Sequence, residues 1–417
     1  AVGGETLVNT SLFGLSVPGI TITALSDGGY VVIWKIGTFG SDSNIYAQRY
    51  GSDGMAVGGE TLITRDISNG KIEPKVVGLP DGDYLVTWTS IGSDNGSLGI
   101  YSKTVSTTIE QPAFVAGPEV QVNTTTANEY IAPAITALSD GGYIVTWTSP
   151  YGQDDNSADI YSQRYSASGA KVGDETPVTT TAKNQYDSVV TGLSDGGYVI
   201  TWTSTQQSSN YWDIYAQRYS ASGAKVGDET LVGTSGANKY SSVVTELSDG
   251  GYVVTWVSVG FGLGGIYAQR YSASGTKVGG ETRVNSSGWQ LDNPAVTGLS
   301  DGGYVVTWES NNGQDGSGSG VYAQRYSASG AKVGDETLVN TTTAGDQGAP
   351  AVTGLSDGGY VITWGGTGEI YAQRYSASGT KVGGETLVNT TTGNTQLTPS
   401  ITTLSDGGYV VIWVSCA

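Results

Sequence analysis

The chain has 417 residues, and its 19 basic and 38 acidic side chains give it a net charge of −19. It contains no His and a single Cys, Cys416, which excludes a Ser-His-Asp triad, a His-ligated zinc site and an internal disulfide. The negative charge disfavours nucleic acid as a partner, and no apolar run is long enough for membrane insertion. The 64 Gly, 26 Tyr and 10 Trp favour strands joined by tight turns.

Three phrases recur in a fixed order along the chain. The first, Leu-Ser-Asp-Gly-Gly-Tyr-(Val/Ile)-(Val/Ile)-(Thr/Ile)-Trp, has eight copies, the second of them divergent, which end at Trp34, Trp88, Trp147, Trp202, Trp256, Trp308, Trp364 and Trp413. The second phrase, Ile-Tyr-Ala-Gln-Arg-Tyr, follows each of the first seven copies. The third, Lys-Val-Gly-(Gly/Asp)-Glu-Thr-Leu-Val-Asn, closes each unit and also opens the chain. A spacing of about 50 residues is typical of repeats that form one structural unit each.

In chain order, the phrases predict a single repeat array over residues 1–417. It consists of an opening strand at 1–10, seven full repeats over about 20–390, and a final hairpin at about 398–415. Each repeat reads as four short strands, because Asp-Gly and Ser-Gly turns separate runs rich in Val, Tyr and Thr. In one repeat we expect these strands at 295–299, 304–308, 321–326 and 332–340.

The second strand of each repeat indicates the architecture. Tyr304, Val306 and Trp308 share one face, and the opposite face is also largely apolar. A strand that is apolar on both faces needs packing partners on both sides, as the blades of a propeller provide. We therefore predict an all-β fold of tandem four-stranded antiparallel repeats, forming a β-propeller of about eight blades, with an open β-repeat array as the alternative.

The strand count falls one short of eight complete blades. Three explanations stay open: an irregular last blade, a strand donated by another copy of the chain, or a piece of a longer array. The sequence alone does not choose among them.

The charged residues that recur in every repeat are interpreted as scaffold. The Asp of each Ser-Asp-Gly-Gly turn, such as Asp301, is expected to accept a hydrogen bond from its own turn. The Arg of each Gln-Arg-Tyr phrase, such as Arg325, is expected to pack its stem on the next blade or to pair with the Glu of the third phrase, such as Glu336.

Residues that break the repeat are better candidates for binding. Tyr211, Trp212 and Trp289 are aromatic residues outside the pattern, with Asp213 beside the first two. Exposed rings flanked by polar side chains suit a sugar. The alternative is that these rings fill gaps at blade edges.

Acidic residues in the loops between second and third strands are the candidate metal ligands. They are Asp154, Asp155, Asp159 and Asp315. Carboxylate and carbonyl oxygens suit calcium, although no loop has the complete Asp-x-Asp-x-Asp-Gly spacing. No other cofactor is expected.

The phrases Leu-Ser-Asp-Gly-Gly-Tyr-Val-Val-Thr-Trp, Gly-Gln-Asp-Gly-Ser-Gly and Ile-Tyr-Ala-Gln-Arg-Tyr resemble the tandem repeats of very large secreted bacterial proteins, which are often adhesin-like. The resemblance covers nearly the whole chain. It implies an extracellular or cell-surface location, a calcium-rich setting and a surface or matrix role. It carries over no functional residue, and the calcium-binding Gly-Gly-x-Gly-x-Asp array that accompanies such repeats is absent from this sequence.

These observations favour a non-enzymatic extracellular surface or matrix protein that acts in adhesion or as the building block of an extracellular fibre. The expected partners are neighbouring copies of the same chain or surface glycans. A carbohydrate-binding, lectin-like propeller is the alternative. A glycoside hydrolase ranks third, because it would need Arg, Tyr and acidic residues that converge in one place, and the sequence shows only repeat copies of them.

Overall fold

The computed structural model describes residues 5–9, 15–37, 43–64, 70–91, 98–107, 115–116, 118–124, 131–150, 157–179, 183–205, 211–234, 236–260, 264–286, 291–392 and 394–416. All regular structure in these ranges is β-strand. They contain no helix of a length and hydropathy that would cross a membrane.

The chain forms two compact units, the first of which comprises residues 1–192 with 404–406. Its strands are β1 (Leu15–Ala24), β2 (Tyr30–Ile36), β3 (Asn44–Tyr50), β4 (Ala56–Leu62), β5 (Lys71–Gly78), β6 (Tyr84–Ile91), β7 (Leu98–Ser106), β8 (Val115–Ala116), β9 (Val120–Gln121), β10 (Ile131–Ala137), β11 (Tyr143–Ser149), β12 (Asp159–Tyr165), β13 (Lys171–Pro177) and β14 (Gln185–Gly192). They form sheets of order β1-β2-β3-β4, β5-β6-β7-β8 and β10-β11-β12-β13, and β9 also pairs with β7.

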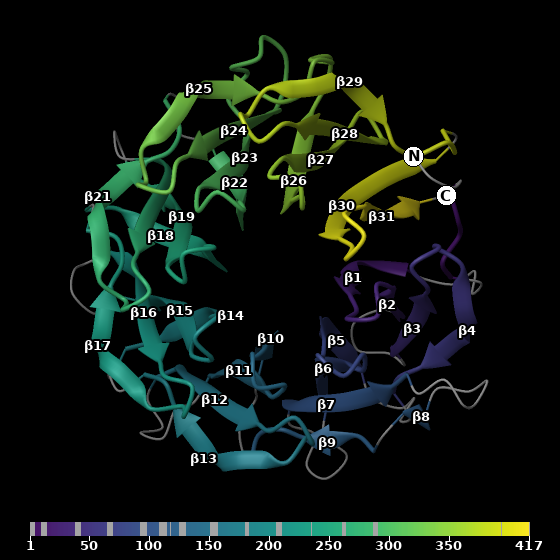
Figure 1. The fold of residues 1–417 in the computed structure, drawn as a ribbon, viewed down its shortest axis with the longest axis vertical. Coiled ribbons are helices and arrows are strands. Elements are labelled where there is room, and N and C mark those ends of the chain that lie inside the picture. Colours follow the sequence, from purple (N-terminus) through teal and green to yellow (C-terminus); the bar gives the residue numbers. More distant parts are fainter. Residues whose placement is uncertain are drawn as a thin grey trace. The chain divides into compact units, whose positions relative to one another are not determined.

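The second unit comprises residues 193–403 with 407–417. Its strands are β15 (Tyr198–Thr205), β16 (Trp212–Tyr219), β17 (Lys225–Leu231), β18 (Asn238–Glu246), β19 (Tyr252–Val259), β20 (Gly265–Tyr271), β21 (Lys277–Arg283), β22 (Leu291–Gly298), β23 (Tyr304–Ser310), β24 (Gly320–Tyr326), β25 (Lys332–Leu338), β26 (Gln347–Gly354), β27 (Tyr360–Gly366), β28 (Glu369–Tyr375), β29 (Lys381–Leu387), β30 (Thr395–Thr403) and β31 (Tyr409–Cys416). Four strands in chain order make each full sheet, as β22 to β25 show in green in Figure 1.

With β14-β15-β16-β17 as the fourth sheet, the described residues hold seven complete blades and one two-stranded hairpin, β30-β31. The predicted fold class is confirmed: the chain is an all-β protein with antiparallel blades of the β-propeller type. The count differs slightly from the expected eight, because the eighth Trp phrase forms only a hairpin among the described strands.

The Ser-Asp-Gly-Gly turn adopts the predicted geometry. The amide of Gly303 donates to Asp301 Oδ1 at 2.9 Å, and the amide of Leu299 donates to the Gly303 carbonyl at 2.8 Å. Gly302 has φ +83, a conformation that glycine adopts without strain. A Cβ on Gly303 would stand 2.3 Å from the Tyr326 carbonyl oxygen, so this second glycine is needed for the close approach of β24.

The core lies between successive blades. Trp308 in β23 is fully buried, and its cluster includes Leu247 and Val253 from the preceding blade. Across β23 and β24, Tyr304 stacks on Tyr326 with ring centroids 4.6 Å apart. Both faces of the second strand are therefore buried, as its apolar sequence predicts.

The recurring Arg has a different partner from the Glu that we expected. Arg325 forms an ion pair with Asp301 of its own blade, because the register places Arg325 opposite Val305, near the turn. Glu336 instead accepts a hydrogen bond from the Ser286 amide at 2.5 Å and so fastens the end of the preceding blade. The expected stem packing is confirmed: a Cβ on Gly379 of the next blade would stand 3.2 Å from Arg325 Cδ.

Two details of the expected elements differ. Residues 5–9, part of the predicted opening strand, have no strand structure. Residues 5–9 carry the third phrase, which in a complete blade forms the fourth strand and pairs with the third strand of the same repeat. In the first repeat that position is already taken, because β3 pairs with β4. The first strand of the repeat near residue 300 starts at Leu291, earlier than predicted, and contains a β-bulge with Asn293 at φ 51.

Two substitutions at Asp301 distinguish the contribution of the turn hydrogen bond to stability from that of the ion pair. The Asp301 side chain is 49% exposed, so solvent screens its ion pair, and Asp301→Asn keeps the side-chain oxygen that accepts from Gly303. We expect Asp301→Asn to lower the free energy of unfolding by less than about 1 kcal/mol. Asp301→Ala, which also removes the turn hydrogen bond, should cost about 1 kcal/mol more. Urea unfolding of both variants measures the difference, and equal losses would contradict the role of the turn hydrogen bond.

Candidate ligand-binding site

Two of the three aromatic residues predicted to bind a ligand, Tyr211 and Trp212, lie together in the second unit. Trp212 is the first residue of β16 and pairs in register with Thr205 of β15, and Tyr211 immediately precedes it. The side chains are 46% and 41% exposed. These values are far above the near-zero exposure of Trp202 and Trp256 in the blade cores, so neither ring fills a gap in the core.

Beneath this pair lies an ion pair that is closed off from solvent. Asp213 is 3% exposed, and its Oδ1 accepts a hydrogen bond of 2.7 Å from Nζ of Lys239. Lys239 is fully buried and also donates to the Ala237 carbonyl at 3.0 Å. The negative charge of Asp213 is therefore neutralised by a lysine in β18, the first strand of the next sheet.

Two departures from the repeat produce this ion pair, one that provides space and one that provides the cation. At the end of the fourth strand, other blades have a side chain such as Asn340, whose Oδ1 accepts from the Val321 amide at 2.9 Å. Here the position is Gly233, where a Cβ would stand 2.9 Å from Lys239 Cδ and 2.8 Å from Trp256 Cζ2. At the position of Lys239, three other blades carry a neutral Gln, at Gln185, Gln347 and Gln396, whereas Lys71 is the equivalent buried lysine of the second blade. Gly233 thus provides the space that the longer lysine stem occupies.

The same segment holds the exposed rings in place. The amide of Trp212 donates to Asn238 Oδ1 at 3.0 Å. A Cβ on Gly236 would lie 3.7 Å from the ring of Tyr211, so the backbone there is in close contact with that ring. We call Tyr211, Trp212 and Asn238 the aromatic platform. Its position is fixed by backbone contacts and by the Asp213–Lys239 pair, and it offers ring faces and an amide to solvent.

The remaining predicted site residues do not join the platform in what the structure describes. Trp289, Asp154 and Asp155 lie outside the described residues. Asp159, in the first unit, is buried at the start of β12, where its Oδ1 accepts from Thr179 Oγ1 at 3.1 Å.

Asp315, in the second unit, closes a turn by accepting from the Ser317 amide at 3.1 Å. Within the described part of the chain, no three His, Cys, Asp or Glu side chains are grouped as a metal would require. Calcium binding stays a prediction for the loop that includes Asp154 and Asp155.

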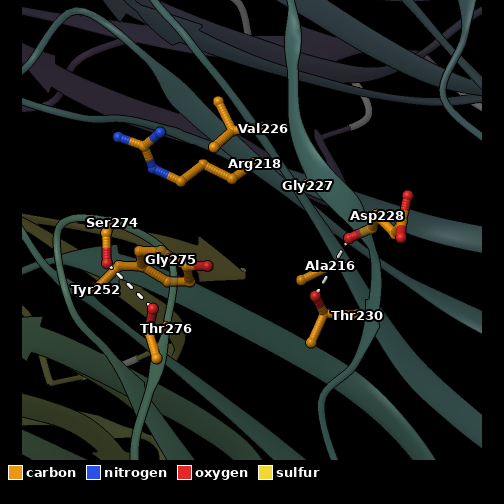
Figure 2. Close-up of a pocket in the computed structure, with 10 residues that line it drawn as sticks. All are labelled: Ala216, Arg218, Val226, Gly227, Asp228, Thr230, Tyr252, Ser274, Gly275 and Thr276. Carbon is orange, nitrogen blue, oxygen red and sulfur yellow. Dashed lines mark hydrogen bonds between the residues drawn. The ribbon is translucent and has the colours of Figure 1, made fainter.

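The platform residues line neither of two cavities in the second unit. The first has a volume of about 170 Å³ and lies between β16–β17 and the turn before β21. Figure 2 shows Arg218, Asp228 and Tyr252 among its lining residues. The volume is below the roughly 300 Å³ at which ligand pockets begin. Arg218 is engaged with Asp195, and burial raises the pKa of Tyr252 to about 12. Arg218 and Tyr252 both belong to the repeat, and their contacts are part of the scaffold.

The second cavity, of about 320 Å³, lies where β18 and β22 end. It is lined by Thr245 to Ser248 and Thr297 to Ser300. Glu246 is its one departure from the repeat, and its carboxylate accepts from the Ser194 amide. That carboxylate therefore already has a structural partner within the repeat framework.

No family model and no curated protein matches this chain. Among solved structures, prolyl oligopeptidase B from Galerina marginata is similar over 95% of this chain and 55% of its own, with 13% identity and a TM-score of 0.52. A structure from a study of two prolyl endopeptidases is similar over 97% and 52%, with 14% identity and a TM-score of 0.52. An α-L-arabinanase from Penicillium chrysogenum, complexed with arabinobiose, is similar over 73% and 94%, with 17% identity and a TM-score of 0.42.

This chain spans about half of the two peptidase structures. At such low identity, the likeness to them shows the fold alone, and that fold is the β-propeller described above.

Proposed function

We propose that this chain is a non-enzymatic, extracellular binding propeller that attaches to carbohydrate through the aromatic platform. The single observation that carries the proposal is the exposure of Tyr211 and Trp212 on a rigid base that the repeat does not otherwise contain. Ring faces contribute large contact area at a low cost in conformational entropy, because Tyr and Trp have only two side-chain torsions.

The chemistry of the platform suits binding better than catalysis. Asp213, the nearest carboxylate, is held by Lys239 and shielded from solvent, so it is not placed to exchange protons with a ligand. Asn238 uses its Oδ1 for the Trp212 amide, which leaves its NH₂ group as a donor for a ligand hydroxyl. Stacking with one or two hydrogen bonds is the arrangement expected for a neutral sugar.

The charge of the chain narrows the class of ligand. A net charge of −19 repels sulfated or uronic-acid polysaccharides at low salt, whereas neutral glycans experience no such repulsion. The ligand we propose is therefore a neutral surface polysaccharide, and the biological role is adhesion of the surface or matrix that carries this protein.

Trp212→Ala tests the proposal. We expect the wild-type chain to bind neutral glycans on an array, and the variant to bind the best of them at least about tenfold more weakly, equivalent to about 1.4 kcal/mol. Tyr409→Ala is the matched control, because Tyr409 is 40% exposed but lies on β31, away from the β16 segment. Binding that is unchanged in Trp212→Ala, or equally reduced in both variants, would contradict the assignment of the platform.

A further inference from the structure

The gap between the fourth and fifth blades contains a cavity with a buried wall and a polar rim. Its volume is about 170 Å³, and it lies between β16–β17 and the turn before β21. Ala216 and Tyr252 are buried in its wall, whereas Asp228 and Thr276 are exposed at its rim (Figure 2). The space equals that of about six water molecules, which is too small for a drug-sized ligand but close to the size of one sugar residue. A small solute can therefore reach the polar groups of the rim.

The carboxylate at the rim is not required by the framework. The position of Asp228 carries Asp in three blades, as at Asp174 and Asp335, and Gly in three others, as at Gly280 and Gly384. A Cβ on either of these two glycines would meet no atom within 4 Å, so the blades fold equally well without a side chain there. Asp228 is therefore available to bind a ligand.

The turn on the other side of the gap also varies between blades. Thr276 is the last residue before β21, and three other blades have an alanine at this position, namely Ala170, Ala224 and Ala331. The Thr276 Oγ1 atom lies 3.1 Å from Ser274 Oγ, so the threonine adds a second hydroxyl to the rim. This gap thus combines a carboxylate with two neighbouring hydroxyls.

The same combination recurs between β25 and the turn before β29. Asp335 lies on β25, and the turn contains Thr380, whose Oγ1 is again 3.1 Å from a serine hydroxyl. A Cβ on Gly379 would stand 3.2 Å from Arg325 Cδ, against 3.1 Å for the equivalent pair of the first gap. The gap between β21 and the turn before β25 has Gly and Ala at the two variable positions instead. Carboxylate and threonine therefore occur together in two gaps and are both missing from the gap between them.

The charges beside the cavity favour a neutral ligand. Arg218 lines the cavity and forms an ion pair with Asp195, while its Nε is shielded from solvent and has no hydrogen-bond partner among the described residues. The carboxylate of Asp228 repels an anion, and the guanidinium of Arg218 disfavours a cation. An acceptor carboxylate, an N–H donor and hydroxyls that both donate and accept match the hydroxyl groups of a sugar.

We propose that the gap between the fourth and fifth blades binds one neutral sugar residue through its hydroxyl groups, and that the gap between the sixth and seventh blades is a second site of the same kind. Asp228 in the first site, and Asp335 in the second, accepts hydrogen bonds from neighbouring hydroxyls of the sugar. The hydroxyls of the facing turn bind the other side of the ligand. Neither site includes the aromatic platform, so the proposal does not depend on the function proposed for the platform.

Amide chemical shifts test the two sites separately. The probe is methyl β-D-glucopyranoside, titrated into the full isotope-labelled chain, and the reporters are the backbone amides of Gly275 and Gly379 in the two turns. We expect both amides to shift saturably, with a dissociation constant on the order of 1 mM, as is usual for a ligand of about a dozen non-hydrogen atoms. The methyl glycosides of glucuronic acid and of glucosamine, which carry a negative and a positive charge, should both bind more weakly.

Asp228→Gly and Asp335→Gly serve as controls for each other. Each substitution introduces the residue that other blades already have at this position, so we expect the fold to be unaffected. Asp228→Gly should weaken binding at the Gly275 reporter by about tenfold or more and leave the Gly379 reporter unchanged, because hydrogen bonds to a charged acceptor are lost at one site only. Asp335→Gly should give the reverse pattern. Asp174→Gly, beside a gap whose turn has alanine, should change neither response.

Three results would overturn the proposal. They are the absence of a saturable shift at about thirtyfold the expected dissociation constant, an equal effect of the two substitutions on both reporters, and equal binding of the charged glycosides. Trp212→Ala should leave the shifts of both turns intact, because Trp212 does not line the cavity. Failure of carbohydrate binding at the platform is therefore distinguishable from failure of binding in the gaps between blades.

Discussion

Replacing Lys239 by Met will lower the free energy of unfolding by about 3–5 kcal/mol, the usual result when one partner of a buried ion pair is removed. Met matches the length of the lysine stem, so the space beside Gly233 and Trp256 stays filled. The loss therefore comes from the Asp213 carboxylate, which is 3% exposed and would lose its ion pair with Lys239. Chemical denaturation of the variant and the wild type measures the effect.

A double variant separates the charge from the packing. Asp213→Leu combined with Lys239→Met removes both charges, and we expect it to recover most of the lost stability, because apolar replacements of a buried pair are often close to neutral. Lys225→Met, at an exposed position on β17, is the control and should change stability by less than about 0.5 kcal/mol. A loss under about 1 kcal/mol in Lys239→Met would show that the pair is solvated and that the platform lacks the rigid base described here.

The platform was only partly predictable from the sequence. Tyr211, Trp212 and Asp213 stand out because they break the repeat, and that signal is local. Lys239 is 26 residues away, and its contact with Asp213 depends on the space left by Gly233. Repeat alignment contains a usable signal, since Gly233 replaces an Asn or Thr at the end of one blade, and Lys239 in the next blade stands where Gln185 and Gln347 stand in theirs. Only the structure shows that these departures meet.

The fold was predictable because its determinants are local. Each Asp-Gly-Gly turn fixes a hairpin, and the alternation in the second strand fixes its two faces, so the blades follow from short phrases. The ion-pair partner of Arg325 could not be predicted from the sequence. Asp301 and Glu336 recur with the same period, and the sequence does not give the register between strands that decides between them. The bulge at Asn293 was also missed, since an Asn at positive φ has no distinct sequence pattern within a strand.

Raising the pH from 10 towards 12 will unfold the chain, and tyrosine burial is the cause. Tyr50, Tyr143, Tyr252 and Tyr360 are each at most 3% exposed, and burial raises the pKa of each to about 12. Tyrosines in the unfolded chain ionise near pH 10. Between these values the unfolded chain has released protons that the folded chain retains, so the free energy of unfolding falls as the pH rises.

The expected slope is steep because several blades each contribute such a tyrosine. Each contributes about 1.4 kcal/mol per pH unit, and the four together contribute about 5 kcal/mol per pH unit above pH 10, with no contribution well below it. Urea unfolding at several pH values, followed together with the ultraviolet absorbance of phenolate, measures the slope and its origin. Combining Tyr143→Phe with Tyr360→Phe should reduce the slope by about 3 kcal/mol per pH unit, because phenylalanine keeps the ring stack and has no proton to lose. Stability that stays level from pH 10 to pH 12, or a slope that the two Phe substitutions leave unchanged, would show that these phenols are solvated in the folded chain.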